Sequence, residues 1–278
     1  MFMIIKTIVA LAPVLLVWAF VYLRSKDKKM DFKYVALFFA LGVLSVFPLR
    51  YIERFLYYIV LMPFSSDAVQ LFTSRDSGNY TFEVYILIIV MQLIDAALAE
   101  EGMKFCIFTF LQKKFKPINT VYDSIVCAVS VSLGFAALEN LLYILSKGIG
   151  SGLLRAFLAI PGHAFYGIIM GYLYSLYLVK TRAAAEEKKL MDEGVIPAGN
   201  NLISGRRELI LSFALPIALH TFNNTCTMNG HLILLALLYV AFVIFMYIYC
   251  IRKILNVSRN NISMEDCAAD VLIKKYSK

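Results

Sequence analysis

The feature that most constrains the fold is a series of long apolar blocks that recur along most of the chain. A helix needs about 20 apolar residues to cross roughly 30 Å of hydrocarbon, and only helices or closed barrels satisfy the backbone there. The blocks lack the alternation of barrel strands, so helices are expected. With 60% apolar and 17% charged residues, a water-soluble core is excluded. We therefore predict an all-α, polytopic transmembrane helical bundle that forms one domain over residues 1–278.

The apolar blocks predict about seven spans. They are residues 2–23, 34–60, 82–112, 121–146, 153–179, 207–225 and 231–252. The second block contains Pro48, with Arg50, Glu53 and Arg54 after it, so we expect an interruption there and an amphipathic stretch at the membrane interface. The polar segment 180–206 predicts a helical extension followed by a turn.

The basic residues indicate the orientation of the chain. Of the 27 lysines and arginines, 20 fall in 24–33, 113–116, 180–207 and 252–278, which share one side of a seven-span arrangement. The amino terminus is therefore expected outside, with residues 253–278 as a cytoplasmic tail. The net charge of +8 does not indicate nucleic acid, because short basic clusters between apolar blocks are explained by topology and by headgroups of the lipid bilayer. The five cysteines show no metal-ligand spacing.

Three ionisable residues lie inside the third block: Glu100, Glu101 and Lys104. A charge at the bilayer centre costs roughly 2.5–3.5 kcal/mol on insertion scales, so these side chains are expected to face protein, water or one another. At about 100° per residue they share one narrow arc, with Glu100 and Lys104 one turn apart. One interpretation is a buried ion pair with a spare carboxylate. The other is an acid–base site, because two adjacent carboxylates beside an ammonium differ in their tendency to hold a proton.

Three later spans each contribute polar groups: Glu139 in FAALEN, His163 in HAFYG, and His220 with Asn224 in HTFNN. A single intramembrane histidine is commonly a hydrogen-bonding residue between helices. Four spans that all supply such groups favour one functional site instead.

Two mechanisms of peptide-bond hydrolysis are open on these residues. In the first, Glu100 or Glu101 activates a water, while His163, His220 and Asn224 bind the developing negative charge.

In the second, Glu139, His163 and His220 hold a zinc ion, and a glutamate of the third span is the base. The spacing of the residues does not decide between the two, so the cofactor is open, with zinc as one possibility.

The four motifs carry a resemblance to a known family. AEEGMK (99–104), FAALEN (135–140), HAFYG (163–167) and HTFNN (220–224) resemble, in order, the EExxK, FAxxE, HAxxG and HxxxN pattern of the PrsW family of intramembrane proteases. That family is similar to the group of CAAX endopeptidases and bacteriocin-immunity proteins. The resemblance defines residues 99–224 as the motif-bearing catalytic core.

The resemblance implies a multi-pass peptidase of the bacterial plasma membrane that makes the first, site-1, cut in a membrane-spanning anti-sigma factor, in a stress response. The catalytic residues that it implies are Glu100, Glu101, His163 and His220. The supporting residues are Lys104, Glu139 and Asn224.

Two other classes of function remain open. Intramembrane ionisable groups also build ion- or proton-coupled transporters, and a sensor or immunity protein would keep the cavity only to bind a peptide.

The predicted topology places Glu100 and Glu101 roughly 26 Å along their helix from the outer surface, deeper than His163 and His220. We therefore expect a tilt or kink in the third helix, or a shifted boundary.

Overall fold

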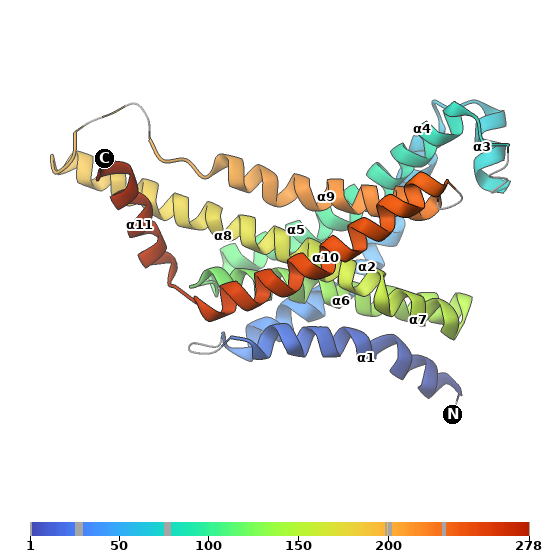
Figure 1. The fold of residues 1–278 in the computed structure, drawn as a ribbon, viewed down its shortest axis with the longest axis horizontal. Coiled ribbons are helices and arrows are strands. Elements are labelled where there is room, and N and C mark those ends of the chain that lie inside the picture. The colour runs from blue at the N-terminus through green and yellow to red at the C-terminus, as the bar shows by residue number, and fades with distance from the viewer. Residues whose placement is uncertain are drawn as a thin grey trace.

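The computed structural model describes residues 2–25, 30–74, 79–197, 199, 202–229 and 232–277. Over these residues the fold is all-α and contains no strand, and the helices lie side by side in one bundle (Figure 1). The elements are α1 (Phe2–Leu23), α2 (Phe32–Leu61), α3 (Ser66–Ser74), α4 (Phe82–Met91), the π-helical segment η2 (Gln92–Leu98), α5 (Ala99–Phe115), α6 (Val121–Lys147), α7 (Ile149–Phe157), α8 (Ala159–Asp192), α9 (Arg206–Met228), α10 (Ile233–Arg259) and α11 (Met264–Tyr276).

Seven helical runs in the described part of the chain are long and apolar enough to cross a membrane, which confirms the predicted count. The third run is α4, η2 and α5 together, Phe82–Phe115. The predicted span 153–179 lies within the run Ile149–Asp192, which is divided at Leu158 into α7 and α8. The amino terminus and α11 lie at opposite ends of the bundle, as an odd number of spans requires (Figure 1).

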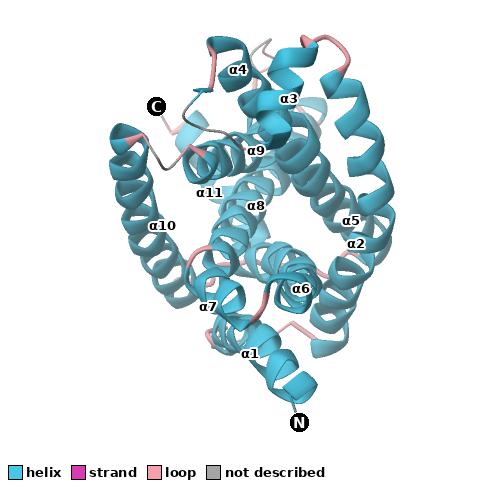
Figure 2. Ribbon diagram, turned by 90° about the vertical axis from the view of Figure 1, so that its right-hand side faces the viewer, coloured by secondary structure: helices cyan, strands magenta, loops and turns pink. Residues whose placement is uncertain are grey.

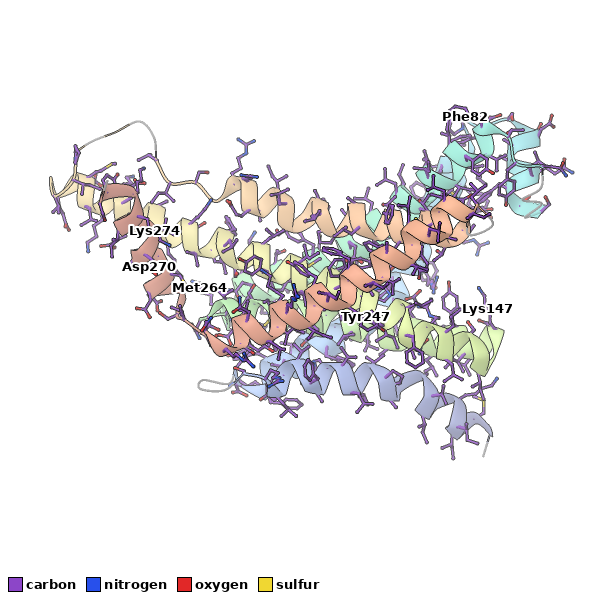
Figure 3. All side chains as sticks on the ribbon, viewed as in Figure 1. Phe82, Lys147, Tyr247, Met264, Asp270 and Lys274 are labelled. Carbon is purple, nitrogen blue, oxygen red and sulfur yellow. The ribbon has the colours of Figure 1, made fainter. Side chains whose placement is uncertain are left out.

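Helix α6 forms the core of the bundle, with every residue from Tyr122 to Ala137 buried. It packs against α1, α2 and α8, and it is surrounded by other helices in the end-on view (Figure 2). The packing requires glycine, because a Cβ at Gly134 would lie only 2.0 Å from the Phe39 carbonyl oxygen of α2. Helix α10 is more peripheral and exposes apolar side chains; its Tyr247 hydroxyl donates to the carbonyl oxygen of Phe157 in α7 at 2.6 Å (Figure 3).

Helix α2 continues through Pro48 as far as Leu61, so the expected interruption at Pro48 is wrong. Proline removes one backbone hydrogen bond, but membrane helices tolerate this where neighbouring helices support them. Val46 and Leu49, on either side of the proline, are buried in a cluster with Phe135 of α6. Packing against α6 therefore holds the two halves of α2 in one helix.

The predicted helical extension and turn in 180–206 are confirmed. Helix α8 continues to Asp192, and a turn follows at 193–196. The extension leaves the core of the bundle and provides a surface for α11 (Figure 1).

Residues 253–277 are largely helical. Helix α10 includes the first of them, and α11 packs on the extension of α8. Glu187 is fully buried there and accepts hydrogen bonds from Lys275 Nζ at 2.5 Å, from the Tyr276 hydroxyl at 2.7 Å and from the Ile203 backbone N–H at 2.8 Å. This end of the chain is thus docked by a buried carboxylate.

The third span changes its helical geometry at η2, directly before the two glutamates. A π-helical turn carries more residues per turn than an α-helix, and such segments are frequent at functional sites. In Figure 1, α4 is inclined to α6 and α8. The inclination of α4 agrees with the expected tilt or kink of this helix.

Candidate active site

A cavity of about 470 Å³ is lined by residues of every element from α2 to α9, including η2. Five of the seven residues predicted from the motifs line it: Glu100, Glu139, His163, His220 and Asn224. The other two, Glu101 and Lys104, are fully buried and bonded to residues of the wall. The fold thus brings together residues from four different spans.

Lys104 is the centre of the polar network. Its Nζ donates to Glu101 Oε1 at 2.7 Å and lies 3.4 Å from Glu100 Oε2 and 3.1 Å from His163 Nδ1. It also lies 4.3 Å from the centroid of the Phe135 ring, a cation–π distance. The predicted ion pair is therefore present, but its short bond is to Glu101, with Glu100 less closely held.

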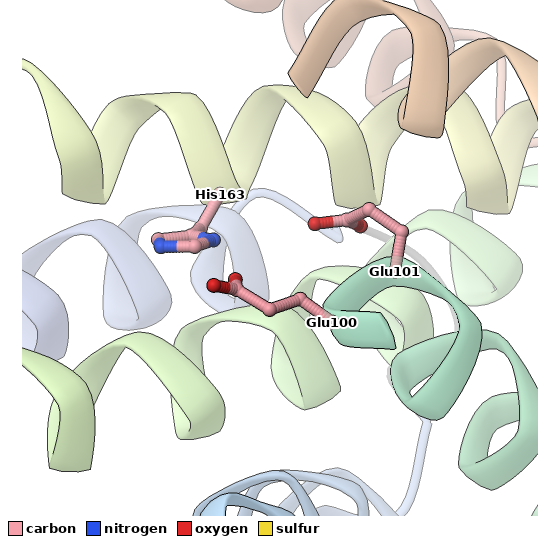
Figure 4. A group of neighbouring side chains, drawn as sticks. All are labelled: Glu100, Glu101 and His163. Atoms are coloured by element: carbon pink, nitrogen blue, oxygen red, sulfur yellow. The ribbon is translucent and has the colours of Figure 1, made fainter. Parts of the chain in front are cut away.

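The two glutamates reach the site because they stand in the first turn of α5, immediately after η2. Figure 4 shows both carboxyl groups directed from α5 toward the imidazole of His163 on α8. Pro161 stands in the first turn of α8, where its missing N–H is not needed, so the helix can begin close to His163. Local backbone geometry therefore places the acidic and imidazole groups opposite each other.

Both ring nitrogens of His163 are already engaged. Nε2 lies 3.0 Å from Glu139 Oε2, and Nδ1 lies 3.1 Å from the ammonium of Lys104. Because the ammonium is only a donor, this network assigns Nδ1 as acceptor and Nε2–H as donor. His163 therefore has no further N–H to offer, so its expected role in binding negative charge requires one of these bonds to break.

Glu139 is held by a cation that the sequence reasoning did not assign to the site. Arg155 Nη2 lies 2.6 Å from Glu139 Oε2, and its guanidinium carbon lies 3.9 Å from the centroid of the Tyr143 ring. The sequence analysis assigned Arg155 no role, although it lies near the start of the predicted span 153–179. No motif in the sequence indicated that Arg155 would contact Glu139.

His220 lines the cavity and has one ring nitrogen engaged. Its Nδ1 lies 3.0 Å from Glu101 Oε1, which assigns Nδ1–H as a donor to the carboxylate. Asn224, one turn later, also lines the cavity, and its Oδ1 accepts from Asn223 Nδ2 at 3.1 Å. The side chains of α9 thus add polar groups to the wall opposite Glu100.

The cluster fits a divalent metal ion by ligand type. Glu100, Glu101 and His163 each offer a ligand atom, and these atoms all lie within 4.8 Å of one another. Carboxylate oxygen and imidazole nitrogen are common ligands of zinc. Glu101 Oε2 is buried without a hydrogen-bond partner among the described residues, so the cluster has an acceptor that an ion would satisfy.

This trio differs from the zinc set predicted from the sequence, which was Glu139, His163 and His220. Glu139 is bound to Arg155 and lies on the opposite side of His163 from Lys104. The Lys104 ammonium lies within 3.4 Å of all three residues of the observed trio, so it competes with an ion for the same donors.

Fold and site together define a multi-pass membrane protein whose spans enclose an acid–base centre of carboxylates, imidazoles and one ammonium. The sequence profile described as "PrsW family intramembrane metalloprotease" matches residues 31–250. This chain therefore belongs to the PrsW family of intramembrane metalloproteases, as the four motifs indicated, and it is a membrane-embedded endopeptidase.

Individual relatives agree with the family match. Protease PrsW of Oceanobacillus iheyensis is 30% identical over 214 residues, which cover 77% of this chain and 79% of the relative. Protease PrsW of Bacillus subtilis is 30% identical over 205 residues, 73% of this chain and 80% of the relative. Protease PrsW of Shouchella clausii is 26% identical over 258 residues, 92% of this chain and 99% of the relative. No solved structure matches the chain significantly.

Proposed function

We propose that this protease makes the first cut in a membrane-bound anti-sigma factor, with a water activated by Glu100 as the nucleophile. One observation carries the assignment of the base: Glu100 lines the cavity, while Glu101 is fully buried and already bonded to Lys104 and His220. A general base must reach the proton it removes. Of the two adjacent glutamates, Glu100 is the one that meets this condition.

The proposed reaction balances without a further reagent. Glu100 takes a proton from the water, and the water oxygen forms a bond to the scissile carbonyl carbon, whose π electrons move onto the carbonyl oxygen. As the tetrahedral intermediate collapses, the C–N bond breaks, and the proton held by Glu100 passes to the leaving nitrogen. One water is consumed, and a new carboxyl end and a new amino end result.

Glu101 and Lys104 act in this scheme as positioning residues. Glu101 Oε1 accepts hydrogen bonds from Nδ1–H of His220 and from the ammonium of Lys104. Both groups are therefore preorganised. Lys104 compensates two carboxylates that would otherwise be buried without a counter-charge.

A metal-dependent route is the second candidate, because the donor set fits an ion. Glu100, Glu101 and His163 would hold it, and a bound zinc supplies an activated water and polarises a carbonyl. The competing ammonium of Lys104 is the reason that we favour the glutamate route.

The substrate class follows from where the site lies and from the family resemblance. The cavity is lined mainly by spanning helices, so a peptide bond reaches it most directly from a single-span membrane protein. The amino terminus is proposed outside a bacterial plasma membrane, with residues 253–278 in the cytoplasm and residues 99–224 as the catalytic core. A reporter fused after residue 278 should be active only in the cytoplasm, and activity outside would reverse the orientation.

The function is tested with purified protein and a panel of single-span anti-sigma factors in detergent micelles. Wild type should cut a member of the panel, and Glu100→Gln and His220→Ala should not. The matched control is Glu186→Gln, an exposed glutamate on the α8 extension, which should cut at the wild-type rate.

A zinc chelator separates the two mechanisms in the same assay. Undiminished cleavage supports the glutamate route, while loss of cleavage that added zinc restores supports the metal route. If wild type cuts other single-span proteins but no anti-sigma factor, the proposed substrate is wrong and the protease activity stands.

A further inference from the structure

Tyr166 lies in the wall of the cavity, three residues after His163 on α8. Its ring stacks on the imidazole of His220, with centroids 4.9 Å apart and planes inclined by 19°. The side chain is 1% exposed, so the surrounding residues fix its position. No role was assigned to this residue from the sequence, where it is one letter inside the HAFYG motif.

The hydroxyl of Tyr166 is buried and has no hydrogen-bond partner among the residues that the structure describes. A buried phenol normally finds a partner, because leaving it without one costs free energy. The preceding turn of α8 leaves room beside it: Gly162 also lines the cavity, and a Cβ there would lie 3.7 Å from the hydroxyl oxygen. The unmet donor therefore belongs to a residue of the cavity wall and lies beside a second one.

The donors closest to Glu100 are already engaged within the polar network. The N–H of His163 is used by Glu139, and the Nδ1–H of His220 is used by Glu101. The Lys104 ammonium is shared among its own buried partners. An oxyanion that forms beside Glu100 thus needs a hydrogen bond from elsewhere in the wall.

We propose that the Tyr166 hydroxyl donates a hydrogen bond to the carbonyl oxygen of the scissile peptide and stabilises the negative charge that develops there. This inference rests on the proposed glutamate-activated hydrolysis. The donor is unsatisfied before substrate binds, and its bond to the carbonyl oxygen strengthens as negative charge forms there, which is the differential binding that accelerates a reaction. Stacking on His220 holds the hydroxyl in place.

The test is Tyr166→Phe, which removes the hydroxyl and keeps the stacked ring. The probe is a pool of quenched fluorogenic single-span peptides in micelles, and kinetics are measured on the member that wild type cuts fastest. Loss of one oxyanion donor should lower kcat by about 100-fold or more, with KM within about twofold. Thermal unfolding of the variant should match that of wild type.

The matched control is Tyr174→Phe, two turns further along the same helix. Tyr174 is equally buried, but it packs on Phe105 and Phe108 and does not line the cavity. It should leave kcat and KM unchanged.

Three results would overturn the inference. A Tyr166→Phe protein with the kcat of wild type, while Glu100→Gln is inactive, removes the role of the hydroxyl and leaves the proposed function intact. A raised KM with unchanged kcat assigns the hydroxyl to ground-state binding instead. Equal rates for wild type and Glu100→Gln refute the proposed function itself.

Discussion

The substitution Lys104→Met tests whether the buried ammonium holds the site together. The side chain has no exposed surface, and its Nζ compensates Glu100 and Glu101 at 3.4 and 2.7 Å. Methionine is similar in size, so the change removes the charge while leaving little empty volume. Breaking a buried ion pair from one side costs about 3–5 kcal/mol, because it leaves an uncompensated charge. We expect Lys104→Met to lose this amount of unfolding free energy.

The assay is reversible unfolding in mixed micelles of increasing denaturing detergent, followed by helical circular dichroism. A second variant, Lys104→Met with Glu101→Gln, should recover part of the loss, because the unpaired carboxylate is gone. The control is Lys180→Met, whose partner is Glu208 and whose side chain is 36% exposed, and it should cost no more than about 1 kcal/mol. If Lys104→Met unfolds like this control, or if the double variant is no more stable than the single one, the reasoning is refuted.

Three further predictions concern packing and the docked carboxyl-terminal helix. Gly134→Ala should destabilise the protein by about 1–3 kcal/mol or more, because the Cβ would meet the Phe39 carbonyl, whereas Gly150→Ala, with open space around it, should be neutral in the same unfolding assay. Glu187→Ala should release α11 and make it sensitive to added protease at a concentration that leaves wild type intact. The hydrogen bond to Glu187 raises the pKa of Lys275 in the folded protein. The stability that this contact contributes should be complete below the pKa of Lys275 in the unfolded chain and should be lost as pH rises through the raised pKa of the folded protein. Resistance of α11 to protease that is unchanged at strongly alkaline pH would contradict this.

Much of the architecture could be predicted because the membrane allows few solutions. Apolar blocks had to be helices, and the cost of charge in hydrocarbon meant that the ionisable residues of four spans had to meet. Helical spacing placed Glu100, Glu101 and Lys104 on one arc. It could not show that Lys104 bonds Glu101 more closely, because that depends on η2 and on rotamers set by neighbouring helices.

The features that were missed depend on contacts between distant segments. Pro48 signals a break in isolation, but packing on α6 overrides it. Arg155 carries no site motif, and its contact with Glu139 forms only when α7 packs beside α6. Tyr166 is one of many aromatic residues in the sequence, and its stacking on His220 depends on the packing of α9 against α8. No periodic pattern in the sequence predicts the contact of Arg155 with Glu139 or the contact of Tyr166 with His220.

The measurement that tests the central claim most directly is the initial rate of single-span substrate cleavage by wild type and by Glu100→Gln at equal protein concentration. General acid–base catalysis contributes about 10²–10⁴-fold, so the account predicts a rate reduced by that factor in a variant that folds normally. A Glu100→Gln protein that cuts within tenfold of wild type would contradict the account.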